Sequence, residues 1–167
     1  NIEEYFFGEK RESLIFMAVG ALAIVTALLS LLLSRQAYYR GAAIPMLALG
    51  LVLGIVGYTV FSRADRQRID NVYAYDMNPA RLKQQELPRM QKVMRLFLLY
   101  RYMELVLLLI GISLFLYYRS NPAFAFWKGL GAALALMALI ALAADFFAER
   151  RAAAYTRGLI ELTGQMQ

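Results

Sequence analysis

The sequence contains no cysteine and no histidine. The lack of cysteine excludes disulfides, iron–sulfur clusters and zinc sites built on thiolates. The lack of histidine removes the commonest ligand of haem and other metals, and also the side chain that titrates near neutral pH. We therefore expect no cofactor and no metal site in this protein.

Motifs of catalysis are also missing. The sequence has no HExxH, no GxGxxG and no GxxxxGK[ST]. A serine–lysine pair is not expected, because Ser30, Ser34 and Ser113 have no lysine beside them at the same depth. The only acidic residues in or near the apolar stretches are Glu104 and Asp145, which are too few for metal-assisted chemistry on lipid phosphates. We predict that the protein is not an enzyme.

Charged residues make up only 18% of the chain and hydrophobic residues 60%, a balance unlike that of globular domains. The hydrophobic residues form four long runs, and about 20 helical residues cross a hydrocarbon core about 30 Å thick. The first run is too long for a cleaved signal peptide and follows a segment that is more acidic than basic. We predict an all-α polytopic membrane domain over 1–167, with four transmembrane helices in two hairpins, at 14–34, 42–62, 96–118 and 123–147.

The distribution of basic residues predicts the orientation. In this topology the N-terminal interfacial segment 1–13, the connecting segment 63–95 and the tail 148–167 share one side of the bilayer. They carry 13 Lys and Arg residues, whereas the far ends of the hairpins carry 4. Because Lys and Arg are enriched on the cytoplasmic side, we place both termini in the cytoplasm and the protein in the inner membrane. Attraction to anionic lipid accounts for the net charge of +6, so the expected partner is the lipid bilayer and no nucleic acid.

The connecting segment 63–95 and a weak internal repeat complete the organisation. Ile69, Val72 and Tyr73 alternate with charged residues at helical spacing, which predicts that the second span continues as an amphipathic helix. Asn78 and Pro79 indicate the start of a new, short helix, and Pro88 disfavours its simple continuation. The motif YYR occurs at 38–40 and 117–119, and AD at 64–65 and 144–145, as a duplicated hairpin would give.

Small residues line one face of three of the predicted spans. Since no hydrophobic force drives helices together in lipid, close backbone approach at small residues holds them together. The second span has Gly50, Gly54 and Gly57, which include a GxxxG motif. Two interpretations stay open for this seam: it packs inside the protein's own bundle, or it packs against a partner or a second copy.

The third span carries two charges, Arg101 and Glu104, within an otherwise apolar run. They are three residues apart on one helix, and Asp145 near the end of the fourth span is expected at a similar depth. We predict an intramembrane ionic cluster of Arg101, Glu104 and Asp145, because an unpaired charge in lipid costs about 2.5–3.5 kcal/mol. The cluster could fix helix register, bind a cation or proton at Glu104, or contact another membrane protein.

Two classes of function remain. The first is a non-enzymatic membrane protein that acts through protein–protein interaction, as an accessory subunit of a complex or as an immunity-type factor that neutralises a membrane-inserting toxin. A membrane-protein partner or a homo-oligomer is expected in that case. The second is a small oligomeric transporter or channel with an acidic site at Glu104. We favour the first, because the charges cluster at one end of the spans and do not follow a route across them.

Overall fold

The computed structural model describes residues 2–164 and confirms the all-α prediction, with 96% of these residues helical. The long helices are α1 (Ile2–Leu33), α2 (Ala37–Met77), α4 (Leu87–Tyr118) and α5 (Ala125–Gly164). Three short elements connect them: α3 (Pro79–Arg81), the π-helical η1 (Leu82–Glu86) and the 3-10 helix η2 (Pro122–Phe124). Among the described residues, four helical stretches are long and apolar enough to cross a membrane.

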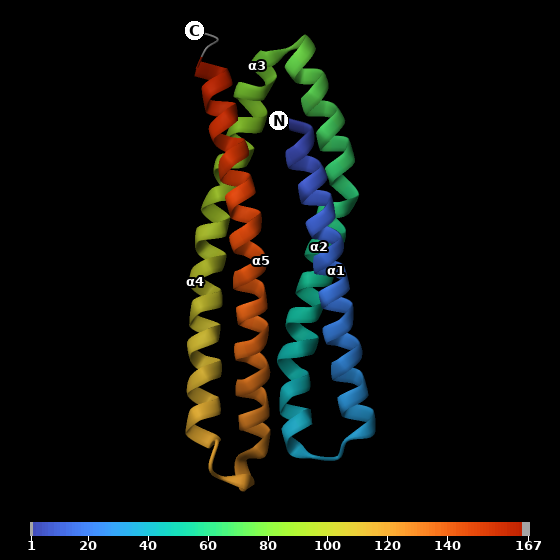
Figure 1. Cartoon of the computed structure of the whole chain (residues 1–167), viewed down its shortest axis with the longest axis vertical. Coiled ribbons are helices and arrows are strands. Elements are labelled where there is room, and N and C mark those ends of the chain that lie inside the picture. The colour runs from blue at the N-terminus through green and yellow to red at the C-terminus, as the bar shows by residue number, and fades with distance from the viewer. Residues whose placement is uncertain (1, 165–167) are drawn as a thin grey trace.

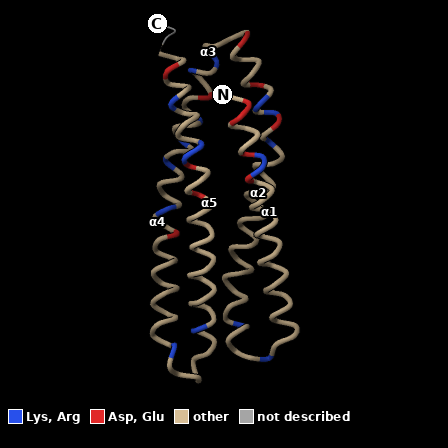
Figure 2. The backbone as a smooth tube through the Cα atoms, in the orientation of Figure 1, with Lys and Arg blue, Asp and Glu red and all other residues tan. Residues whose placement is uncertain are grey.

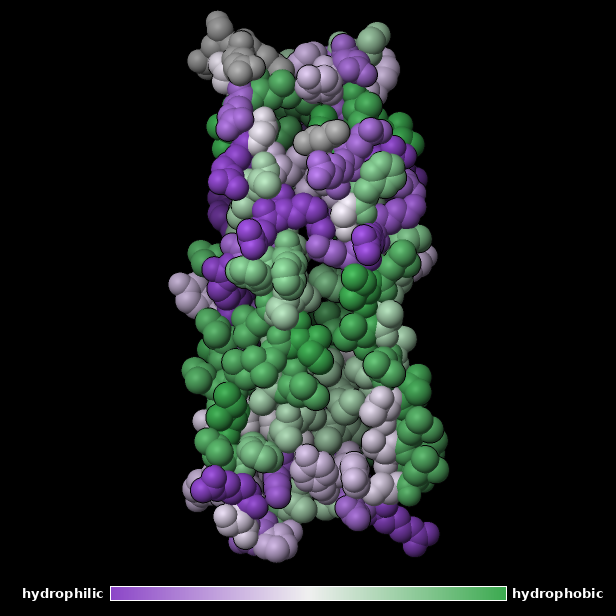
Figure 3. Space-filling view, viewed as in Figure 1, coloured by the Kyte–Doolittle hydropathy of each residue, from purple (hydrophilic) through white to green (hydrophobic). Residues whose placement is uncertain are grey.

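The helices are arranged as two neighbouring pairs (Figure 1). Helix α1 packs along α2, α4 packs along α5, and α2 also packs against α5. We call residues 2–13, 63–95 and 148–164 the charged head, and the opposite end, with the connections 34–36 and 119–124, the tip end. Figure 2 shows that most Lys, Arg, Asp and Glu residues lie in the half of the bundle that contains the charged head. Figure 3 shows a wide apolar band between two hydrophilic ends.

Side-chain size along the apolar band is inverted relative to a water-soluble protein. Buried positions on α1 are occupied by small residues such as Gly20, Ala23 and Ala27, whereas Leu22 is 67% exposed. A bundle in water would bury its large apolar side chains to remove them from the solvent. Helices surrounded by hydrocarbon instead gain most from close contact at small residues, which is the pattern seen here.

Glycines set the closest helix crossings. A Cβ atom built on Gly41 of α2 would collide with the carbonyl oxygen of Phe126, and one on Gly129 of α5 would collide with that of Tyr38. Between α4 and α5, a Cβ on Gly111 would lie 2.5 Å from the backbone nitrogen of Ala135. The contacts of Gly41 and Gly129 close the tip end with direct backbone packing of α2 on α5, and that of Gly111 packs α4 closely on α5.

The helix continues past Pro88, but with a π-helical turn before it. The helical path runs from Pro79 to Tyr118 through η1, and Pro88 occupies the first turn of α4. Proline cannot donate a backbone hydrogen bond, and its ring crowds the carbonyl four residues earlier. The wider π-helical turn at 82–86 directly precedes the proline, which is where such a defect is absorbed without ending the helix.

The glycine contact at the tip end gives a first prediction. Gly129→Ala should lower the free energy of unfolding by about 1–3 kcal/mol, because its methyl group must displace the Tyr38 backbone. Gly158→Ala is the matched control: no atom lies within 4 Å of its Cβ position, so a gain of about 0.5–1 kcal/mol in helix stability is expected. Thermal unfolding in detergent followed by circular dichroism measures both. Equal shifts in the two variants would contradict the close crossing.

Candidate functional site

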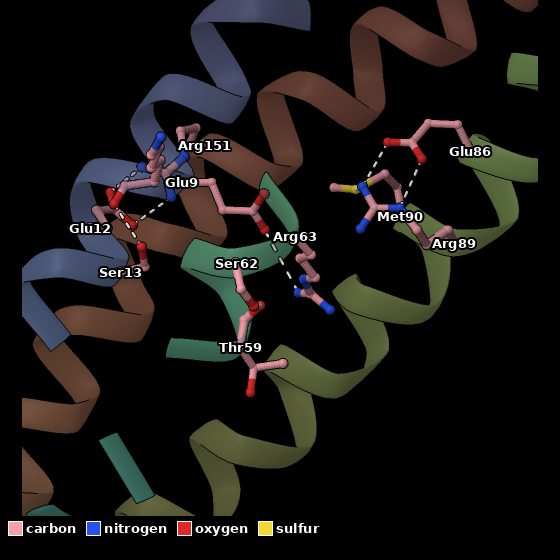
Figure 4. A network of polar contacts seen from close by, with 11 residues as sticks. Glu9, Glu12, Ser13, Thr59, Ser62, Arg63, Glu86, Arg89, Met90 and Arg151 are labelled. Atoms are coloured by element: carbon pink, nitrogen blue, oxygen red, sulfur yellow. Dashed lines mark hydrogen bonds and ion pairs between the residues drawn. The ribbon is translucent and has the colours of Figure 1, made fainter. Parts of the chain in front are cut away.

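A layer of ion pairs lies where the apolar band meets the charged head. Arg151 of α5 pairs with Glu12 of α1, and Arg63 of α2 lies 3.9 Å from Glu9 of α1 (Figure 4). A further pair, between Arg101 and Glu149, joins α4 to α5. Each pair connects two helices, so together they tie all four long helices at this level. We call these three pairs the ionic layer.

Beyond the ionic layer, the charged head has the one large hydrophobic cluster among the described residues. Its buried members are Tyr5, Phe6, Met90, Ala152, Tyr155 and Leu159. The rings of Tyr5 and Tyr155 stack with centroids 4.2 Å apart and planes 9° apart, which joins α1 to α5. Aromatic stacking of this kind adds about 0.5–1.5 kcal/mol to the burial itself.

A buried carboxylate reinforces this cluster. Glu86 is only 6% exposed, and its two oxygens accept hydrogen bonds from Nε (2.8 Å) and an Nη (2.7 Å) of Arg89. The hydroxyl of Tyr155 donates a third bond, 3.1 Å long, to the same carboxylate. Burial alone would lower the pKa of Arg89, but the hydrogen bonds to Glu86 outweigh burial. The pKa of Arg89 is therefore raised, and its guanidinium stays charged. Burial raises the pKa of Tyr155, so the phenol stays protonated and donates.

The structure brings Glu104 and Asp145 together but pairs Arg101 with another residue. The carboxyl groups of Glu104 and Asp145 interact across the α4–α5 contact, and Arg101 acts on both electrostatically. The ion pair of Arg101 is with Glu149. One oxygen of Glu104 is buried and has no hydrogen-bond partner among residues 2–164. Glu104 lies about 4.5 Å deeper than Arg101 along α4, at 1.5 Å per residue.

Sequence reasoning missed Glu149 and Arg151. Glu149 follows Asp145 by four residues and therefore shares its helix face, a signal that identifies it as a second acid within reach of Arg101. The partner of Arg151 is Glu12, 139 residues away, and no spacing rule links two residues on helices that are not adjacent in the chain.

A cavity of about 540 Å³ lies between the two helix pairs and is lined by all four long helices. Its wall is mostly apolar, and Glu104 and Asp145 line it together with the ionic-layer residues Glu9, Glu12, Arg63 and Arg151. A second hollow of about 610 Å³ lies in the charged head, between the ends of α1, α2 and α5. No group of three or more His, Cys, Asp or Glu side chains suited to a metal ion occurs within residues 2–164.

The glycines of the second span point in different directions. Added Cβ atoms on Gly50 and Gly57 would crowd α1: the first lies 3.0 Å from the Gly20 carbonyl oxygen, the second 2.7 Å from that of Ser13. A Cβ on Gly54 would meet nothing within 4 Å. Gly50 and Gly57 therefore lie at the α1–α2 contact, and the Cβ direction of Gly54 faces open space.

Comparison of the chain with models of protein families, with characterised proteins and with solved structures finds no match. Geometry and chemistry are therefore the basis on which we assign a function.

Glu9 gives a prediction of pH dependence. One of its carboxylate oxygens is buried without a hydrogen-bond partner in the described chain, and burial raises its pKa despite the nearby charge of Arg63. A raised pKa in the folded state means that stability falls as the pH rises through that pKa. Glu9→Gln should therefore raise the free energy of unfolding at neutral pH, and this gain should shrink towards acid pH.

Chemical unfolding in detergent at several pH values measures the difference between Glu9→Gln and the wild type. Glu161→Gln, at an exposed position of α5, controls for the loss of one negative charge. A gain that stays constant across the pH range would contradict the burial of a charged Glu9.

The glycine directions give a paired test of the second-span seam. Gly57→Ile should lower the free energy of unfolding by about 1–3 kcal/mol, because the isoleucine side chain collides with the backbone of α1. Gly54→Ile, three residues away, should keep both the fold and the particle size, because its side chain enters open space. Unfolding in detergent measures the stability of both variants, and size-exclusion chromatography with light scattering measures their particle size. A smaller particle for Gly54→Ile would show instead that a partner or second copy packs on this glycine.

Proposed function

We propose that this chain is a non-enzymatic, multi-pass protein of the cytoplasmic membrane that acts by binding another membrane protein. In this proposal α1–α2 and α4–α5 insert as two hairpins, with both termini and the charged head in the cytoplasm. The excess of Lys and Arg in the charged head supports this orientation. Binding partners of this type include the core of a complex to which the protein is an accessory subunit, or a membrane-inserting toxin that it neutralises.

The observation that carries the proposal is an apolar stripe on the outside of the charged head. Ile69, Tyr73 and Met77 follow one another at intervals of four residues on α2 and are 60%, 60% and 68% exposed. The opposite face of the same helix segment packs inward, with Ala64 and Ala74 buried. The large apolar side chains of this segment therefore point away from the bundle.

This stripe lies beyond the apolar band, where water would surround it. Residues Arg63 to Met77 extend about 21 Å past the predicted span, at 1.5 Å per residue. Exposed apolar side chains at helical spacing are typical of a surface that receives a second helix. Arg66 and Asp70 flank the stripe with opposite charges, which favours a protein helix with mixed charges over an anionic lipid surface.

Contacts with α1 hold the beginning of the stripe in place. Lys10 of α1 lies 2.5 Å from Asp65 of α2, and Arg68 lies 3.3 Å from Glu3 and over the ring of Phe7. A surface that is ordered before binding loses less conformational entropy when a partner docks. The anchoring contacts on the inner side of α2 thus support a docking role for its outer side.

A transporter or channel with an acidic site at Glu104 is the second candidate, favoured by the cavity beside that residue. Against it stands the tip end, where α2 and α5 pack backbone to backbone at Gly41 and Gly129. Ion flux into liposomes that is lost in Glu104→Gln would replace our proposal with this one.

Photo-crosslinking in native membranes tests the docking surface. A photoreactive residue at position 73 should give one discrete adduct with a single other protein, identified by mass spectrometry. The same residue at Tyr117, which is 82% exposed at the tip end, should not give that adduct. The double variant Ile69→Asp with Met77→Asp should lose the adduct from position 73, because the charges oppose apolar docking.

Three outcomes would overturn this proposal. They are an adduct of twice the chain's own mass, which indicates a second copy; adducts with lipid alone; and an adduct that persists in the double variant. Circular dichroism of the double variant checks that the fold is intact, as expected for two exposed positions.

A further inference from the structure

The cavity between the helix pairs has the size and lining of a small-molecule site. Its volume of about 540 Å³ falls within the range of about 300–1,000 Å³ common for such sites. Phe16 of α1, Leu53 and Val56 of α2, and Met103 and Leu107 of α4 contribute apolar side chains to its wall. An apolar molecule would therefore find complementary surface on three sides.

The charges around this cavity are unbalanced. Its two arginines are already engaged, Arg63 by Glu9 and Arg151 by Glu12. Arg101, the basic residue nearest to Glu104, forms its ion pair with Glu149.

Glu104 and Asp145 are consequently left beside each other with no cation of their own in an ion pair among residues 2–164. One oxygen of Glu104 has no hydrogen-bond partner there. Negative charge in an apolar wall attracts a positive partner strongly, because little water is present to screen it.

Contacts at both ends of the bundle limit access to the cavity. The backbone contacts of Gly41 and Gly129 close it towards the tip end, and the ionic layer lies across the charged-head side. Helices α2 and α4 both line the cavity, but each packs mainly on another helix, α2 on α1 and α5, and α4 on α5. Entry between α2 and α4, from the membrane interior, would let an apolar molecule arrive without crossing water.

From this arrangement we propose that the cavity binds an organic monovalent cation with an apolar body, whose charge lies against Glu104 and Asp145. A metal ion fits less well, because the described residues contain no cluster of three ligands and the wall is apolar. An anionic lipid headgroup is disfavoured by the same two carboxyl groups. This site is independent of the docking stripe on α2 and goes beyond the function proposed above.

A pair of ions of matching shape tests the proposal. Tetraphenylphosphonium and tetraphenylborate carry the same four phenyl groups and opposite charges, so only charge complementarity separates them. The purified full chain is placed in phosphatidylcholine nanodiscs, and binding is measured by equilibrium dialysis against empty nanodiscs. We expect saturable binding of one tetraphenylphosphonium per chain, at least about tenfold tighter than that of tetraphenylborate.

Three variants locate the site. Glu104→Gln with Asp145→Asn should weaken tetraphenylphosphonium binding at least about tenfold. Ala141→Phe keeps both acids and adds bulk to the cavity wall, so it should abolish the saturable binding of either ion. Asp65→Asn, which removes an exposed acid that pairs with Lys10 outside the cavity, should leave binding unchanged.

Several results would overturn the proposal. Equal affinity for the two ions, or unchanged binding in the Glu104→Gln, Asp145→Asn variant, would remove the role of the carboxyl groups. An equal loss in Asp65→Asn would reveal attraction to the general surface charge. One tightly retained lipid per chain that tetraphenylphosphonium cannot displace would assign the cavity to an acyl chain. If the double variant fails to fold, as judged by circular dichroism, Ala141→Phe and the comparison of the two ions still decide the question.

Discussion

The two helix pairs are held against each other by the contact of α2 with α5, and the ion pair between Arg151 and Glu12 adds a link from α5 to α1. The pairs α1–α2 and α4–α5 are each held along their length by small residues. Between the pairs, α2 packs against α5, and α1 makes a smaller contact with α5. Backbone packing at Gly41 and Gly129 fixes the tip end, and Arg151 with the stacked rings of Tyr5 and Tyr155 fixes the charged head. A space remains between these two points, and it is the cavity that contains Glu104 and Asp145.

The apolar band and the charged head use different physics. In the proposed membrane setting, water adds no driving force to helix association within the apolar band, so contact there requires close backbone approach, which glycine permits. In the charged head, water is available, and large side chains such as Phe6 and Met90 are buried as in a soluble protein. Glu86, Arg89 and Tyr155 satisfy one another within that core, which gives it a specific geometry. The charged head can therefore present a fixed outer surface on α2 while the apolar section retains a cavity.

The two proposed sites make different demands on the same fold. The stripe of Ile69, Tyr73 and Met77 requires that α2 keeps its course beyond the apolar band, where ion pairs join it to α1. The cavity requires that α4 stays on α5 without closing against α2. A protein that binds a partner through its charged head and a small cation through its membrane section could couple the two, because α2 takes part in both.

The number of helices, their apolar character and the position of the small residues follow from the sequence alone. Composition and run length are local properties, and about 20 apolar residues per run suffice to identify a candidate span. The sequence also placed Glu104 near Asp145, because helix rise and the antiparallel course of two adjacent spans determine depth. Which face each residue presents was harder to determine: Gly54 looks like Gly50 and Gly57 in a GxxxG pattern, yet its Cβ direction is open.

Only the tertiary structure decided the long-range pairings. Arg101 pairs with Glu149, and Arg151 with Glu12, because the rotation of each helix about its axis selects the partner, and periodicity leaves that rotation undetermined. The continuity of the helix through Pro88 depends on a π-helical turn that no residue pattern announces. The cavity itself is a gap between helices, and a gap is a property of how four helices pack, which no single stretch of sequence encodes.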